Sequence, residues 1–157
     1  MNNDALLEKI RHGDKNSFRE LEELAENENA EAMSNLAEIY LKGLGGFEIS
    51  YKTALKLFNK AAKLDDPRAL FYLGTFYRDG KYGLEQDGYK AAEYFIKGAQ
   101  YVNPNNVAKF LNFAAEIYRY GKGGVRTDGY KALEYLLKAA DLGNNSAKAE
   151  LAMRHQL

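Results

Sequence analysis

Apolar positions recur along the chain with the spacing of amphipathic helices, and one pair of such helices occurs three times. In the first copy, Leu36, Ala37 and Tyr40 place an apolar stripe on a first helix at positions i, i+1 and i+4. A glycine-rich break follows, and a second helix then carries a stripe that includes Ala54 and Phe58. Because glycine ends helices and permits positive φ, the pattern predicts a helical hairpin in each copy.

The three copies repeat with the period of a helical solenoid. They occupy residues 32–62, 69–99 and 110–140, and the equivalent tyrosines Tyr40, Tyr77 and Tyr118 lie 37 and 41 residues apart. Hairpins of this size cannot bury their apolar faces alone and do so by stacking on one another. The sequence therefore predicts an all-α solenoid of three full repeats with degenerate terminal helices.

The repeat also predicts the domain boundaries. Prolines at 67 and 104 stand near the borders between copies, where a proline can begin a helix but cannot lie inside one. We expect a single helical-repeat domain over residues 1–157, with capping helices in 1–29, repeats in 30–63, 67–102 and 105–141, and a C-terminal capping helix in 145–157. Terminal units of a solenoid are expected to be more polar than internal ones.

The consensus LAEIYxxGxGG, followed by YKAxxYxxKAA, resembles the Sel-one-like repeat (SLR), a branch of the tetratricopeptide superfamily. The resemblance covers about residues 30 to 152 and implies a right-handed α–α solenoid whose first helices line a concave, protein-binding surface. Two positions depart from the pattern of this chain's own repeats. Phe110 replaces the small residue of Ala32 and Ala69, and Gly98 replaces Ala61.

Composition and charge narrow the function further. Lys and Arg number 22, as do Asp and Glu, so the summed charge gives no attraction toward nucleic acid or an anionic membrane. The chain has no cysteine, which excludes disulfides and thiolate metal sites. No run of 18 apolar residues exists, and residues 1–5 lack the basic start of a secretory signal, so we expect a cytoplasmic protein that does not bind membranes.

The sequence offers no convergent catalytic constellation. His12 and His155 lie near opposite ends, without a second metal ligand at helical spacing. The glycine clusters follow no strand and contain no Gly-Lys-Ser or Gly-Lys-Thr, so they are not phosphate loops. Asp87 and Asp128, each before Gly-Tyr-Lys, are expected to cap helices rather than bind calcium. We therefore predict no enzymatic activity, no cofactor and no metal.

Binding residues are expected on the first helices, at positions that do not pack into the core. They mix both signs of charge with aromatic side chains, and aromatic and arginine residues usually dominate protein interfaces. The predicted set is Glu38, Lys42, Arg68, Phe71, Thr75, Arg78, Asp79, Asn112, Glu116, Arg119 and Tyr120. The acidic run from Glu20 to Glu31 is interpreted as a solvated face or, alternatively, as a landing site for a basic partner.

Two functional hypotheses follow. In the first, this monomeric protein is an immunity protein that binds and neutralises a cognate bacterial toxin, because short free-standing members of the resembled family occur beside secreted toxins. In the alternative, it is a general adaptor or scaffold that assembles a signalling or envelope protein complex. The neighbouring gene would distinguish the two hypotheses.

Overall fold

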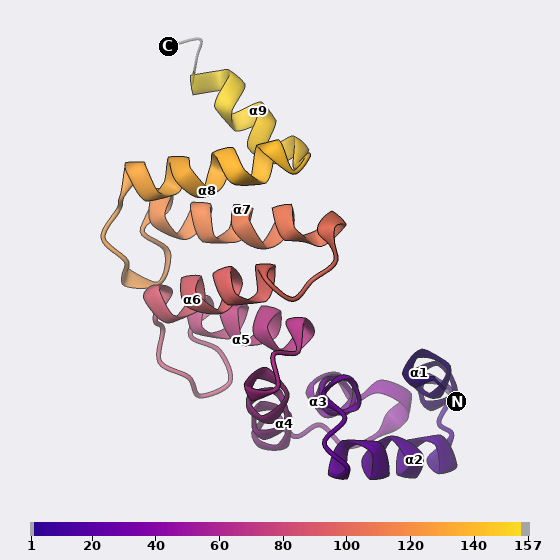
Figure 1. The fold of residues 1–157 in the computed structure, drawn as a ribbon. Helices are drawn as coiled ribbons and strands as arrows, with labels where there is room; N and C mark the ends of the chain where they lie inside the picture. Colours follow the sequence, from indigo (N-terminus) through magenta and orange to yellow (C-terminus); the bar gives the residue numbers. More distant parts are fainter. Residues whose placement is uncertain (1, 155–157) are drawn as a thin grey trace. The chain divides into compact units, whose positions relative to one another are not determined.

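The computed structural model describes residues 2–154, and every regular element in that range is a helix (Figure 1). The α-helices and the two short 3₁₀ turns, η1 and η2, follow one another as α1 (Asn3–Arg11), α2 (Lys15–Glu26), α3 (Ala30–Lys42), η1 (Leu44–Gly46), α4 (Tyr51–Lys63), α5 (Pro67–Asp79), α6 (Gly88–Ala99), α7 (Pro104–Tyr120), η2 (Lys122–Gly124), α8 (Gly129–Asp141) and α9 (Asn145–Arg154). The predicted all-α fold of consecutive hairpins is confirmed.

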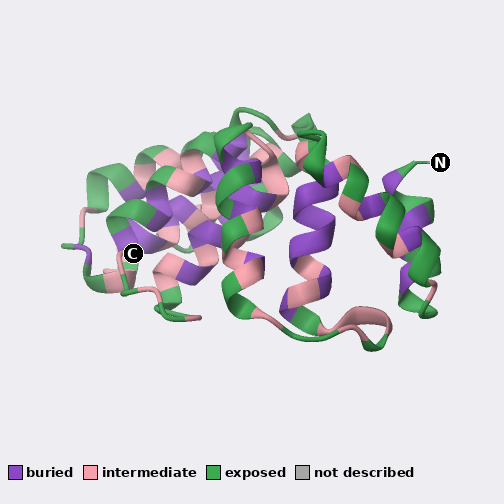
Figure 2. Ribbon diagram, turned by 90° about the horizontal axis from the view of Figure 1, so that it is seen from below, coloured by how far each residue is buried: buried purple, intermediate pink, exposed green. Residues whose placement is uncertain are grey.

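The chain forms two compact units, Met1–Ala69 and Leu70–Leu157. In the first unit, α3 packs against both α2 and α4; in the second, α7 packs against both α6 and α8. Buried residues form stripes along the helices, as Figure 2 shows. The prediction of one continuous domain did not distinguish these units, because the repeat pattern runs through both.

Side-chain caps determine where the helices begin. The Asp87 carboxylate accepts a hydrogen bond from the backbone N–H of Lys90 at 3.0 Å, and Asp128 caps α8 in the same way. These caps satisfy backbone donors that have no partner inside the helix. The capping role predicted for both aspartates is confirmed, and equivalent caps recur at Asp14, Asn29, Ser50, Asp66 and Asn144.

In the second unit, the two departures from the repeat compensate for each other. The Phe110 ring is 5% exposed and belongs to an aromatic core with Phe71 and Phe95. A Cβ added to Gly98 would lie 2.3 Å from Cε1 of Phe110, far inside van der Waals contact. The larger Phe110 side chain therefore fits because the facing residue has none.

Glycine also permits a close contact between consecutive hairpins of one unit. A Cβ on Gly88, at the start of α6, would lie 2.1 Å from the carbonyl oxygen of Lys122 in η2. A Cβ on Gly123 would lie 2.5 Å from the backbone of Gly88. In the first unit, η1 packs on α1, and a Cβ on Gly45 would lie 1.9 Å from the carbonyl oxygen of Ile10.

The corresponding position on α8 is open. Gly129 is equivalent to Gly88, yet a Cβ added there would meet no atom within 4 Å. The next residue, Tyr130, is 90% exposed, whereas its equivalent Tyr89 is 51% exposed and accepts a hydrogen bond from the N–H of Arg126 at 3.3 Å. The same local sequence is thus packed in one hairpin and solvent-exposed in the next.

We predict opposite outcomes for alanine at the two equivalent glycines. Gly88→Ala forces apart α6 and η2 and should lower the free energy of unfolding by about 1–3 kcal/mol. Gly129→Ala should change it by less than roughly 0.5 kcal/mol, because the site is open. Urea unfolding followed by circular dichroism measures both, and equal effects would contradict the packing role of Gly88.

The Phe110 and Gly98 positions should be energetically coupled. Gly98→Ala alone creates overlap and Phe110→Ala alone leaves a cavity, whereas the double variant places alanines at both positions, as at the equivalent Ala61 and Ala69. The loss in free energy of unfolding of the double variant should therefore be smaller than the sum of the two single losses by at least about 1 kcal/mol. A double-mutant cycle in urea measures this difference, and simple additivity would refute the coupling.

Candidate functional site

The predicted binding residues fall in both units. Glu38 and Lys42 lie on α3, and Arg68 lies in the first turn of α5, all within residues 1–69. The other predicted residues share α5 and α7 of the second unit: Phe71, Thr75, Arg78, Asp79, Asn112, Glu116, Arg119 and Tyr120.

The three residues of the first unit make internal contacts. Lys42 Nζ donates to Glu38 Oε1 at 2.6 Å, as expected for an i, i+4 pair on one helix. The Arg68 guanidinium donates to the amide oxygen of Asn35, which is completely buried. A buried amide requires a partner, so Arg68 stabilises the fold at this point.

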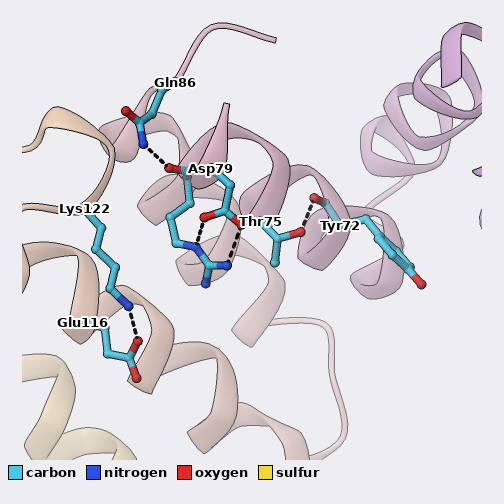
Figure 3. Close-up of polar contacts among 7 residues, drawn as sticks. Tyr72, Thr75, Asp79, Gln86, Glu116 and Lys122 are labelled. Atoms are coloured by element: carbon cyan, nitrogen blue, oxygen red, sulfur yellow. Dashed lines mark hydrogen bonds and ion pairs between the residues drawn. The ribbon is translucent and has the colours of Figure 1, made fainter. Parts of the chain in front are cut away.

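Charged side chains of α5, α7 and η2 form two separate ion pairs, shown in Figure 3. Arg78 donates from Nε and Nη2 to the two carboxylate oxygens of Asp79, at 2.8 and 2.9 Å. Lys122 Nζ donates to Glu116 Oε2 at 2.9 Å, and the Asn112 amide donates to Glu116 Oε1 at 3.3 Å. We call these five residues, together with Arg119 and Tyr120, the α5–α7 face.

The two ion pairs of this face influence each other. The hydrogen bond from Arg78 lowers the pKa of Asp79, and the nearby charges of Arg78, Lys81 and Lys122 lower it further. The pKa of Arg78 is raised chiefly by its hydrogen bond to Asp79, with smaller contributions from the charges of Asp79 and Glu116. Both partners are therefore ionised at neutral pH, and the face presents charges in fixed positions.

Phe71 belongs mainly to the core. Its ring packs edge-on against Phe95, Phe110 and Phe113, with centroids 5.5 to 5.9 Å apart. The Lys109 ammonium lies 4.8 Å from the Phe71 centroid and covers the ring. Phe71 therefore packs against the core beneath the face. It is not placed to act as an aromatic anchor, which would have to be exposed to a partner.

Tyr120 is the exposed aromatic residue of the face. It is 56% exposed, and two cations lie near its ring, with Arg119 Cζ 4.8 Å and Lys122 Nζ 5.7 Å from the centroid. Arg119 also forms an ion pair with Glu150 of α9. The arrangement orders an amphipathic ring at the end of α7, where another molecule can reach it.

The sequence did not identify every residue that organises this face. Lys122 lies in a glycine turn, and Glu150 lies in a terminal helix, so neither occupies a predicted position on a first helix. Their partners are 6 and 31 residues away along the chain, respectively. The folded hairpins bring these charges together, and a helical pattern along one segment does not reveal them.

The described residues contain no grouping suited to metal chemistry. Within residues 2–154, no three His, Cys, Asp or Glu side chains gather where they could hold a metal ion. His12 contacts Glu8 at 3.3 Å on the surface of α1, and His155 lies outside the described residues. In that same range no helix is long and apolar enough to cross a membrane.

The repeat pattern is matched by a known family model. The model of the Sel1 repeat matches residues 30–66, 67–100 and 108–144, which together make up more than half of the chain. The chain belongs to the Sel1 repeat family. This confirms the resemblance seen in the sequence, and the matched segments each contain one first helix, one turn and one second helix.

Three solved structures resemble this Sel1 repeat protein. A Sel1 repeat protein from Oxalobacter formigenes is 28% identical, with a TM-score of 0.71 over 86% of this chain and 96% of that one. A protective antigen of uropathogenic Escherichia coli with an SLR fold is 25% identical, with a TM-score of 0.73 over 92% of this chain and 30% of that one. Helicobacter pylori cysteine-rich protein B, at 22% identity and a TM-score of 0.58 over 86% and 92%, shares the fold. No curated protein matches the chain.

The Asp79–Arg78 pair should make stability depend on pH. The pKa of Asp79 is lower in the folded state than its ordinary value of 3.8, so the pair stabilises the protein above that pH and loses its effect as pH falls through the folded pKa. Asp79→Asn should lower the free energy of unfolding at pH 7 by up to about 1 kcal/mol, since the pair is partly exposed. Urea unfolding between pH 7 and pH 3 should show the difference from wild type shrink as pH falls below 3.8, and a constant difference would contradict this.

Proposed function

We propose that this Sel1 repeat protein is a non-catalytic protein-binding module and that the α5–α7 face contacts its partner. Members of the family generally mediate protein–protein interactions. The observation that carries the proposal is Tyr120, an exposed ring contacted by Arg119 and Lys122, beside side chains whose charges are held in ion pairs. Side chains already ordered in the free protein lose little entropy on binding.

The charges of the face should select the orientation in which a partner binds, in addition to the contact area that the face provides. The face has three basic residues, Arg78, Arg119 and Lys122, and two acidic ones, Asp79 and Glu116. Each of them is held in an ion pair. A partner with complementary charges would be guided into one orientation, while the tyrosine ring supplies apolar contact. A protein surface fits such a mixed face better than a nucleic acid, which requires a predominantly basic one.

Replacing Tyr120 by alanine should weaken partner binding with no loss of helical content. The partner is first identified by affinity capture on the wild-type chain and mass spectrometry, and its affinity is then measured by calorimetry. Tyr120→Ala should raise Kd by about tenfold or more, as expected for an anchor residue. Tyr130→Ala is the matched control, because Tyr130 is also an exposed tyrosine but lies at the start of α8. Equal affinities of both variants and the wild type would refute the face.

Within this function, we propose an immunity role in the cytoplasm as the specific case. Neutralising a toxin requires only a rigid surface that covers the toxin's active site, and a module of this size with an ordered face meets that requirement. The test is to co-express the chain with the product of its neighbouring gene: where that product is a toxin, the chain should rescue growth, and Tyr120→Ala should abolish rescue. A stable complex without rescue would contradict the immunity role and favour the adaptor, which needs a second binding surface.

A further inference from the structure

A groove in the first unit runs between α2 and α4 over α3. It consists of two adjoining cavities of about 320 and 210 Å³ that share Ala25, Glu26, Met33 and Lys60 in their linings. α3 packs against both neighbouring helices, and Met33, Leu36 and Tyr40 of α3 line the space between them. We call this feature the α2–α4 groove.

The floor of the groove is apolar. Three residues of α3 line it: Met33 and Leu36, each 5% exposed, and Tyr40. Leu57 of α4 completes the lining. Met33, Leu36 and Tyr40 are spaced i, i+3 and i+7, so they form one stripe along α3. An apolar floor in a concave site is what binds the apolar side chains of a partner.

One residue that lines the smaller cavity departs from its equivalents in the other two repeats. In the second unit, Tyr77 stacks on Tyr94 at 5.7 Å, and Tyr118 stacks on Tyr135 at 6.0 Å. In the first repeat, Tyr40 is equivalent to Tyr77, but Leu57 stands in place of the second tyrosine. The smaller side chain of Leu57 lines the smaller cavity beside Tyr40, at the position where the other two repeats carry a second tyrosine ring.

The two rims carry opposite charges. The α2 rim presents Glu22, Glu26 and Glu28, and the α4 rim presents Lys56, Lys60 and Lys63. None of these six side chains makes an ion pair with another residue in the part of the chain that the structure describes. Burial raises the pKa of Tyr40, and the charges of Glu22 and Glu48 raise it further, so the field of the acidic rim reaches the floor. The rims are therefore available to an incoming molecule.

We propose that the α2–α4 groove binds an amphipathic helix of a partner protein, with basic residues along one border of its apolar stripe and acidic residues along the other. Leucine-sized side chains at i, i+3 and i+7 of such a helix would fill the two cavities, as in other helix-in-groove complexes. A helix satisfies its own backbone hydrogen bonds, which suits walls made of side chains. Its basic border faces α2 and its acidic border faces α4, so the rims fix the direction in which the helix lies. The groove is formed by residues of the first unit and is separate from the α5–α7 face.

The direct test uses a fluorescein-labelled peptide of about 18 residues, five helical turns, with leucines along one stripe, lysines on one border and glutamates on the other. Fluorescence anisotropy with the full chain measures binding. The peptide should bind saturably, and peptides with both borders basic or both acidic should bind at least about tenfold more weakly. Absence of binding, or equal binding of all three peptides, would overturn the proposal.

Variants of the protein locate the site. Leu57→Tyr supplies the ring found in the other repeats, closes the cavity and should raise Kd at least about tenfold with unchanged helical content. Leu137→Tyr is the matched control, because Leu137 is an exposed leucine on α8 of the second unit. Equal effects of the two substitutions would contradict the groove.

Charge reversal of the exposed rims tests the orientation without touching the core. Either Glu22→Lys with Glu26→Lys, or Lys56→Glu with Lys60→Glu, makes the two rims alike and should weaken binding. All four changes together reverse the sign of the net charge on each rim, with Glu28 and Lys63 left unchanged, and the same peptide should then bind in the opposite direction with much of its affinity recovered. Failure of the fourfold variant to recover binding, while it remains folded, would refute recognition by opposite rims.

Discussion

The close contact between a glycine turn and the preceding hairpin determines how hairpins stack within each unit. In the second unit, η2 lies against the first turn of α6 at a distance that excludes a Cβ on Gly88 or Gly123. In the first unit, η1 approaches the end of α1 just as closely through Gly45. These backbone contacts hold each first helix between two others, so that the small residues of the repeat can pack.

Once that packing is fixed, the two proposed binding surfaces lie where equivalent positions of the repeats differ. In the second unit, charges contributed by a first helix, a turn and a terminal helix surround Tyr120 in the α5–α7 face. In the first unit, Leu57 lines the α2–α4 groove at the position where the other repeats carry a tyrosine. A protein with two such surfaces has what an adaptor requires, while either surface alone is sufficient for a neutralising binder.

The sequence predicted those features that depend on neighbours along one helix or one turn. The helical hairpins, the family and the caps at Asp87 and Asp128 are examples. Features that depend on residues from different hairpins were not predictable from periodicity. The fit of Phe110 against Gly98, the bond from Arg68 to Asn35 and the cavity beside Leu57 all require knowing which side chains face each other across helices. The predicted binding positions on α5 and α7 remain a prediction, now with Phe71 placed in the core and Tyr120 at the surface.

If turn contacts join the hairpins of a unit into one cooperative structure, native-state hydrogen exchange will show it most directly. Amides of α6, α7 and α8 should open with free energies that agree within about 1 kcal/mol, because releasing η2 from α6 exposes both sides of the contact. If α8 and η2 exchanged through an opening several kcal/mol less costly while α6 stayed protected, the turn contact would not be what holds the hairpins together.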